Sequence, residues 1–170
     1  FSVESIDYSA LHEVAALSSV QEVYEEKVLI RYDDREQIAK IRGVKQTPSE
    51  DSLAIEKYIF KGESFRSDSY WAILGQSLAY TLSVSVGQFS EPLQVFVPNV
   101  NAKVNSISER PFVESSFYVS GIYSVQSAYD ASYVITSLKG VQDFLSRPGR
   151  LTHLELNISQ LNLSLIHISE

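Results

Sequence analysis

The chain has 170 residues, of which 44% are apolar and 21% charged, an ordinary balance for a globular protein. At this length we expect one domain, or one domain that carries a small inserted subdomain. The net charge of −7, with Lys and Arg scattered along the chain, argues against a nucleic-acid partner, because binding to phosphates needs clustered cations. The absence of cysteine excludes disulfides and thiolate metal sites.

The sequence also lacks the features of a membrane span or a leader. No apolar run approaches the roughly 18 residues that a membrane helix needs. The chain opens at Phe1 in the middle of a patterned segment, without a Met or a signal peptide. We therefore expect a piece of a longer protein.

The N-terminal segment predicts a short strand and a helix. Residues 1–6 can form the strand. Asp7 or Ser9 can cap the helix that follows, which we expect to continue to about Leu17.

A β-hairpin is predicted next. Residues 20–32 alternate between apolar and polar side chains in two blocks, separated by Glu25, Glu26 and Lys27. Asp33 and Asp34 are a turn signal, and residues 38–41 resume the alternation on the other side. Residues 43–52 look like a loop, and a strand end with a turn is expected at residues 58–63.

The middle third is β-rich and aromatic, with a single short helix. Residues 71–74 read as a buried strand that Gly75 ends, and residues 76–82 as a helix with Leu78 and Leu82 on one face. A second strand is expected at residues 93–97, where apolar residues alternate up to Pro98.

A long polar segment separates that strand from the next. Residues 98–111 predict either a long hairpin or a loop. Residues 116–125 then form a clear strand pattern. The side chains expected on one side of it are Phe117, Val119, Gly121 and Tyr123.

The last third returns to alternating strands and helices. We expect a strand at residues 133–135, a helix capped by Ser137, and a final strand at residues 154–158. Pro148 and Gly149 stop the helix. Its apolar face is formed by Val141, Phe144 and Leu145.

Together these patterns predict an α+β fold in which a discontinuous α/β part is built from both ends of the chain. We expect residues 1–60 and 126–170 to form the two halves of this part. Residues 61–125 would form a β-rich inserted subdomain.

Residues that could carry chemistry are present but poorly arranged. The histidines are His12, His153 and His167. They form no local pair of the kind that binds metals. The acidic pairs at residues 25–26 and 33–34 sit at a strand edge and a turn, where solvated charges are common. With neither a Gly-x-Ser-x-Gly elbow nor a Gly-rich phosphate loop in the sequence, we expect no enzyme activity, no cofactor and no metal site.

Aromatic residues crowd the stretch between residues 112 and 133. They are Phe112, Phe117, Tyr118, Tyr123, Tyr129 and Tyr133. Most are expected in the core, and any that stay exposed would suit a protein interface, where aromatic rings give contact area at low entropic cost.

The order of motifs in residues 70–98 resembles one found in a transporter family. An apolar strand leads into Leu-Gly-Gln-x-Leu-Ala, then Leu-x-Val-x-Val-Gly, and then a strand ending in Val-Pro. This order is similar to that in the periplasmic domains of LolC/LolE-type ABC transporter permeases, the group that also includes MacB-like core domains.

Three further segments carry the same resemblance, which covers about residues 1–158. Residues 20–32 look like the strand pair that follows the first helix of the family. Residues 41–44 resemble the x-x-Gly-Val that closes that hairpin. Residues 117–145 look like its run of strand, Gly, Tyr-Asp, strand and helix.

The resemblance implies a domain that lies outside the inner membrane, between the first two transmembrane helices of a permease. In LolC-like members a protruding hairpin binds the periplasmic lipoprotein carrier LolA, and the matching stretch here is residues 99–112. The residues that this correspondence marks as partner-binding are Val100, Lys103, Val104, Ile107, Arg110 and Phe112. Within the hairpin, the apolar side chains would enter the groove of the carrier and the cations would set its orientation.

Two functions follow from the resemblance. In the first, the chain is the periplasmic domain of a lipoprotein-releasing ABC permease. It would dock a LolA-like carrier that receives the lipoprotein cargo, and would relay motion driven by the cytoplasmic ATPase subunit through the full-length protein and its second permease subunit. In the second, it is a MacB-like or FtsX-like permease domain in efflux or mechanotransmission. A small-molecule binding or hydrolytic domain is a third possibility, and would need a deep pocket with convergent polar groups.

Overall fold

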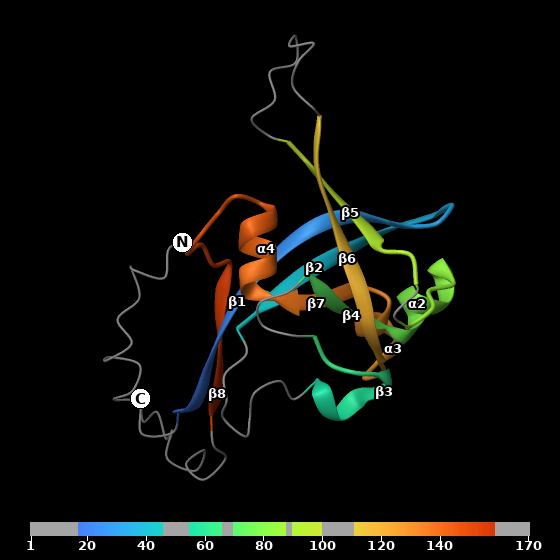
Figure 1. Cartoon of the computed structure of the whole chain (residues 1–170). Coiled ribbons are helices and arrows are strands. Elements are labelled where there is room, and N and C mark those ends of the chain that lie inside the picture. Colours follow the sequence, from blue (N-terminus) through green and yellow to red (C-terminus); the bar gives the residue numbers. More distant parts are fainter. Residues whose placement is uncertain (1–16, 46–54, 66–69, 88–89, 100–110, 159–170) are drawn as a thin grey trace, which may run out of the picture.

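A curled mixed sheet with three short helices forms the described part of the chain (Figure 1). The computed structural model describes residues 17–45, 55–65, 70–87, 90–99 and 111–158. The strands are β1 (Leu17–Tyr32), β2 (Arg35–Val44), β3 (Ile59–Gly62), β4 (Trp71–Gly75), β5 (Leu93–Pro98), β6 (Phe112–Tyr123), β7 (Tyr133–Ser137) and β8 (His153–Ile158). The helices are α2 (Gln76–Leu82), α3 (Ser127–Asp130) and α4 (Leu138–Phe144), with a 3-10 turn at Glu56–Tyr58. The predicted α+β fold class is confirmed.

The strand pairings close on themselves. Six strands follow one another in the order β2-β7-β4-β6-β5-β1, and β1 pairs again with β2. β8 extends the sheet beyond β1, and β3 pairs with β6. The pairs β2–β7 and β4–β6 are parallel, and the remaining pairs are antiparallel.

The main core lies between the β1–β2 hairpin and the β5–β6 hairpin, which cross one another (Figure 1). Helices α4 and α2 stand on either side of this crossing, and each buries an apolar face: Leu138, Val141 and Phe144 from α4, and Leu78, Ala79 and Leu82 from α2. A second, smaller core occupies the opposite face of the sheet around Tyr123, Phe65 and Ile73. Burial of both faces accounts for the apolar character of β4 and β7.

Several predicted elements are confirmed. The turn at Asp33 and Asp34 joins β1 to β2, with Asp33 in the left-handed region at φ 54°. Helix α2 has the predicted bounds of residues 76–82. Ser137 caps α4, because its hydroxyl accepts a hydrogen bond of 3.0 Å from the Gly140 N–H.

The start of the chain differs from the prediction where it can be compared. The structure begins at Leu17, which already belongs to β1, so the predicted helix does not include this residue. The rest of that helix and the strand at residues 1–6 lie outside the described residues. β1 also runs through Glu25 and Glu26 without a break, because its pairing with β2 is continuous from Val23 to Tyr32.

The predicted common face of β6 is wrong beyond Val119. A bulge at Ser120 sets two residues of β6 against a single step of β4, so the alternation reverses there. Phe117, Val119 and then Ile122 therefore face the main core, whereas Tyr123 faces the smaller one. The division into segments 1–60, 61–125 and 126–170 stays a prediction, and strands from all three take part in the one sheet.

Candidate partner-binding surface

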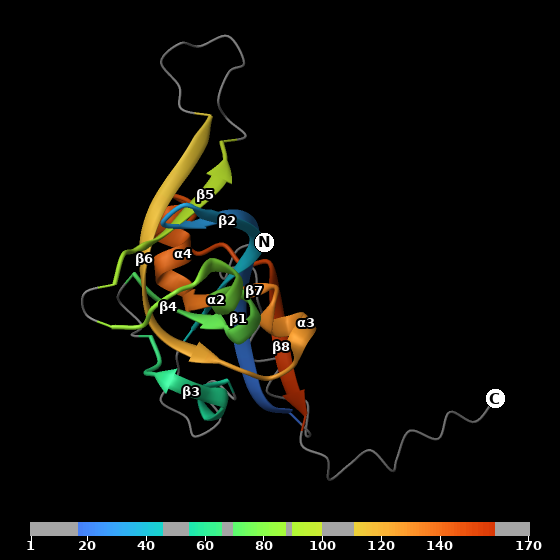
Figure 2. The ribbon, with the colours of Figure 1, turned by 90° about the vertical axis from the view of Figure 1, so that its right-hand side faces the viewer.

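The β5–β6 hairpin projects from one end of the molecule (Figures 1 and 2). β5 pairs with β6 in unbroken register from Leu93 opposite Phe117 to Pro98 opposite Phe112. A further hydrogen bond of 2.8 Å, from the Asn99 N–H to the Pro111 carbonyl, continues the ladder to the base of the connecting segment. The predicted hairpin at residues 99–112 stays a prediction, because residues 100–110 lie outside the described residues and only its base at Asn99, Pro111 and Phe112 is described.

Of the predicted partner-binding residues, Phe112 is described and the others lie outside the described residues. Phe112 is 49% exposed at the base of the hairpin. The residues outside the description are Val100, Lys103, Val104, Ile107 and Arg110.

A pocket of about 430 Å³ opens beside Phe112. β5 pairs with β1 only where residues 94–96 meet residues 29–31, so the two strands diverge beyond Leu29. The apolar side chains that line the pocket are Val28, Leu29, Ile38, Phe96, Val97, Pro98 and Phe112. The charged ones are Glu26, Lys27 and Arg147.

Arg147 and Glu26 neutralise each other at the rim of this pocket. The Nη1 of Arg147 lies 3.3 Å from Oε2 of Glu26 and donates a hydrogen bond of 2.5 Å to the Tyr24 hydroxyl. The hydrogen bond to Tyr24 raises the pKa of Arg147 above its ordinary value, against the smaller effect of burial. The exposed Lys27 is then the one lining charge without a carboxylate partner among the described residues, so the rim carries a net positive charge.

Three of the apolar side chains that line the pocket form a row across three strands. Leu29 stands opposite Ile38 of β2 on one side and Phe96 of β5 on the other. Ile38 is 59% exposed, whereas Leu29 and Phe96 are half-buried. The guanidinium of Arg31 lies 5.0 Å from the centre of the Phe96 ring and covers one end of the row.

The other candidate residues of the sequence do not converge on a site. Glu25 pairs with Arg42, 3.1 Å away, and Asp33 and Asp34 form the hairpin tip. His153 lies 3.6 Å from Glu155, and His12 and His167 lie outside the described residues. Among the residues that the structure describes, no cluster of three or more His, Asp or Glu side chains could hold a metal ion.

Sequence reasoning did not identify the pocket or its charged rim, although part of the signal was present. A two-residue turn at Asp33 and Asp34 fixes the β1–β2 register, which places Leu29 opposite the exposed Ile38. The pairing of Leu29 with Phe96, and the approach of Arg147 to Glu26, join segments that are far apart in the sequence. These contacts carry no local pattern.

Comparisons of the sequence with known proteins find no match, whereas comparison of the structure finds proteins of similar fold. A scan against protein-family models finds no match, and a search of curated proteins finds no similar sequence. Helices long and apolar enough to cross a membrane are absent from the portion of the chain that the structure describes.

Two solved structures are similar over most of the chain. The extracellular domain of the noncanonic ABC-type transporter YknZ from Gram-positive bacteria superposes with a TM-score of 0.63 at 11% identity, over 95% of this chain and 74% of that one. The periplasmic region of MacB from Actinobacillus actinomycetemcomitans gives a TM-score of 0.56 at 12% identity, over 92% of this chain and 64% of that one. The chain therefore has the fold of these extracytoplasmic ABC transporter domains.

Proposed function

We propose that the chain is the extracytoplasmic domain of an ABC transporter permease, and that it binds a protein partner rather than catalysing a reaction. The fold similarity to YknZ and MacB domains supports the general assignment. Fold alone does not determine function, so the assignment also needs support from the arrangement of the chain.

That support comes from where the polypeptide enters and leaves the described fold. The start of β1 pairs with the end of β8, with Leu17 opposite Ile158. This paired end lies opposite the projecting β5–β6 hairpin in both views (Figures 1 and 2). A domain inserted between two membrane helices needs its two connections side by side, with its partner surface turned away from the bilayer. On this proposal the domain lies in the periplasm, as part of an inner-membrane protein.

For the finer function, we propose a lipoprotein-releasing system. The domain docks a LolA-like carrier, which receives the lipoprotein cargo, and relays motion from the ATPase subunit through the full-length protein and its second permease subunit. The observation that carries this proposal is the exposed Phe112 at the base of the hairpin, beside an apolar pocket with a positive rim. An aromatic anchor next to an apolar pocket is a common centre of a protein interface.

A titration of this domain with the LolA-like carrier of the same organism tests the proposal, for example by isothermal calorimetry. Phe112→Ser should weaken carrier binding by roughly tenfold or more, because it removes a central aromatic contact. Replacing residues 101–109 with two glycines should abolish binding if the hairpin inserts into the carrier. Tyr58→Ser is the matched control, since Tyr58 is also exposed (42%) but lies in the 3-10 turn before β3, away from the hairpin, and lines neither pocket.

Each outcome of this titration has a separate meaning. Loss of binding in the hairpin variants alone supports carrier docking at the hairpin. Undiminished binding by both hairpin variants contradicts the assigned surface. If the unmodified domain does not bind the carrier, this chain is not the carrier's dock, and the result favours efflux or mechanotransmission, or docking by the partner permease subunit.

The similarity to MacB favours a second candidate, a MacB-like or FtsX-like permease domain in efflux or mechanotransmission. That function uses a different partner on the same fold. An ATPase domain fused to the same full-length polypeptide, as in MacB-like transporters, would favour it. A separate ATPase subunit together with saturable carrier binding would favour lipoprotein release.

A further inference from the structure

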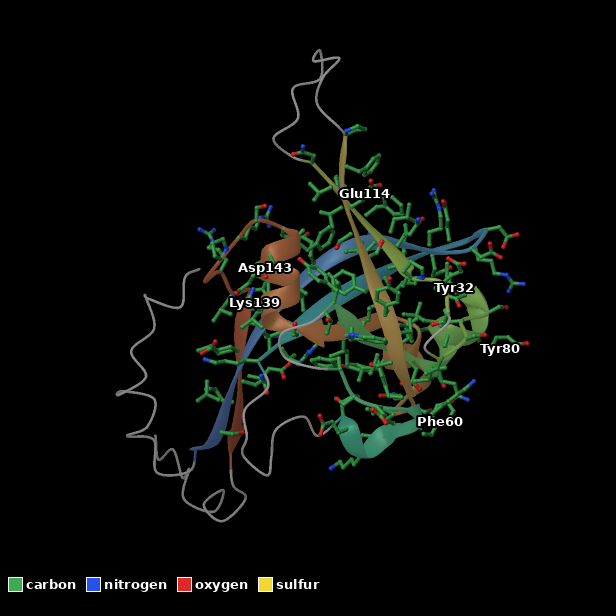
Figure 3. The ribbon with its side chains drawn as sticks, in the orientation of Figure 1. Tyr32, Phe60, Tyr80, Glu114, Lys139 and Asp143 are labelled. Atoms are coloured by element: carbon green, nitrogen blue, oxygen red, sulfur yellow. The ribbon has the colours of Figure 1, made fainter. Side chains whose placement is uncertain are left out.

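A second hollow lies away from the hairpin, between helix α2, strand β3 and the start of β2. It has a volume of about 800 Å³. Ala79, Val84 and Ile122, all buried, form its apolar floor. The exposed rings of Phe60 and Tyr80 line it from two different elements, and both project outward on this side of the molecule (Figure 3). We call this hollow the α2–β3 groove.

Exposed aromatic side chains give this groove the composition of an interface. Tyr80 is 86% exposed and Phe60 is 57% exposed. Neither ring belongs to an aromatic pair among the described residues, in contrast to Tyr129 and Tyr133, which stack on each other. Large rings left in solvent beside an apolar floor are more typical of a binding surface than of a solvated one.

The charges that line the α2–β3 groove are all positive. Arg35 and Lys61 line it, and no carboxylate does. Arg35 donates a hydrogen bond of 3.1 Å to the Thr81 carbonyl, which holds its guanidinium at the C-terminal end of α2. Neither cation forms an ion pair with a described carboxylate, although Asp33 and Asp34 precede Arg35 at the nearby turn. The lining of the groove therefore has the opposite sign to the net charge of the chain, which is −7.

Strand β3, which contributes residues to this groove, lies at an edge of the described sheet. β3 pairs with β6 along one side, and no described strand pairs with its other side. Phe60 and Lys61, which line the groove, both belong to this strand. Open edges are sites where an extended peptide can add as a further strand, with its side chains read by neighbouring pockets.

We infer that the α2–β3 groove binds an extended acidic segment of a partner protein. Carboxylates of the segment pair with Arg35 and Lys61, and its apolar side chains pack against Phe60 and Tyr80. A peptide fits these observations better than a lipid surface does, because surfaces that bind anionic membranes usually present about four to eight clustered cations. The inference is independent of the function proposed for the hairpin, since the two surfaces share no residue.

Fluorescence anisotropy with a labelled peptide of alternating Glu and Leu residues tests this inference. The unmodified chain should bind the peptide saturably, and binding should weaken as salt is raised. The double variant Arg35→Gln/Lys61→Gln should bind roughly five- to tenfold more weakly, as expected for two exposed ion pairs. Phe60→Ser should also weaken binding, although it leaves the charges unchanged.

The matched control is the double variant Lys40→Gln/Arg150→Gln, which removes two exposed cations outside the groove. It should bind the peptide as the unmodified chain does. Circular dichroism melts of all variants verify that they fold. A peptide with Gln in place of Glu should bind weakly if the carboxylates are recognised.

Three results would overturn the inference. Equal losses in the groove variant and the control variant would mean that the peptide responds to overall charge. Equal binding of the Glu and Gln peptides would mean that the carboxylates are not recognised. Binding of the chain to vesicles with anionic lipids, without binding to the peptide, would assign the cations to a membrane surface.

Discussion

At the scale of single residues, Arg42 is a mostly buried cation that is held by two carboxylates. Its side chain is only 13% exposed, and it pairs with Glu25 of β1 and with Glu155 of β8. Burial acts to lower the pKa of Arg42, but the hydrogen bond to Glu155 and the nearby carboxylates outweigh it and raise the pKa. Arg42 thus links three strands, β8, β1 and β2.

Arg42→Ala should lower the free energy of unfolding by about 2 kcal/mol, because two carboxylates lose their shared partner in a mostly buried position. Urea unfolding followed by circular dichroism measures this change. Arg31→Ala is the control, since Arg31 pairs with Glu36 at 41% exposure and should cost less than about 1 kcal/mol. Equal costs for the two variants would contradict a structural role specific to Arg42.

The Arg42 pair could have been predicted from the sequence, whereas the ring contacts could not. The turn at Asp33 and Asp34 pairs Tyr32 with Arg35, and counting back along both strands places Glu25 opposite Arg42. The stack of Tyr129 on Tyr133, with ring centres 4.5 Å apart, depends on how α3 returns the chain to β7. The sequence places both tyrosines near the core without specifying this contact.

At the scale of elements, the backbone of α3 packs closely against the end of β4 at Gly75. A methyl group added at Gly75 would lie 2.1 Å from the carbonyl oxygen and 2.4 Å from the Cα of Asp130. Asp130 is itself fixed, because its carboxylate accepts hydrogen bonds from the N–H groups of Val125 and Gln126 and from the Ser124 hydroxyl. The backbone of α3 therefore has little room to withdraw.

Gly75→Ala should destabilise the fold by about 2–3 kcal/mol, because backbone rather than a movable side chain blocks the added methyl group. Thermal and urea unfolding would measure the loss. Gly149→Ala serves as the comparison, since Gly149 has a positive φ of 68° but nothing within 4 Å of the added carbon, so only about 1 kcal/mol of backbone strain is expected. A smaller loss of unfolding free energy in Gly75→Ala than in Gly149→Ala would show that α3 moves away from the added methyl group easily.

Sequence periodicity predicts where several strands and helices lie along the chain, but it does not predict which strands pair with one another. The alternation in residues 93–97 and the cap at Ser137 depend on local chemistry, and both were predicted. The bulge at Ser120 was not, because it arises from the mismatch between β6 and the parallel strand β4. The family resemblance predicts Phe112 as a partner-binding residue. The pocket beside it could not be predicted, because it forms where β5 diverges from β1 after a short pairing.

At the scale of the whole molecule, buried tyrosines make stability depend on alkaline pH. Burial is the main cause that raises the pKa of Tyr123 far above its ordinary value near 10, and burial also raises the pKa of Tyr129. The Tyr123 hydroxyl donates a hydrogen bond of 3.0 Å to the Tyr133 carbonyl, which also favours the neutral form. The folded state thus keeps these protons at a pH where the unfolded chain releases them.

Because the folded pKa of Tyr123 lies above the unfolded one, its stabilising contribution is complete well below pH 10 and declines as the pH rises through the unfolded pKa near 10. We expect the free energy of unfolding to fall steadily between about pH 9.5 and 11. In Tyr123→Phe this alkaline decline should be shallower, even if the variant is less stable at neutral pH. Urea titrations across this range test it, and parallel slopes for the two proteins would contradict the assignment.

The long strand β6 has a mechanical consequence. Its first half is bonded to β5 and its second half to β4 and β3, so it is held along its whole length from the hairpin to the turn before α3 (Figure 1). Ladder bonds lie across the strands, so a pull along β6 loads many of them at once instead of unzipping them singly. A force applied to the hairpin would therefore be transmitted along β6 to the far side of the domain with little extension of the strand.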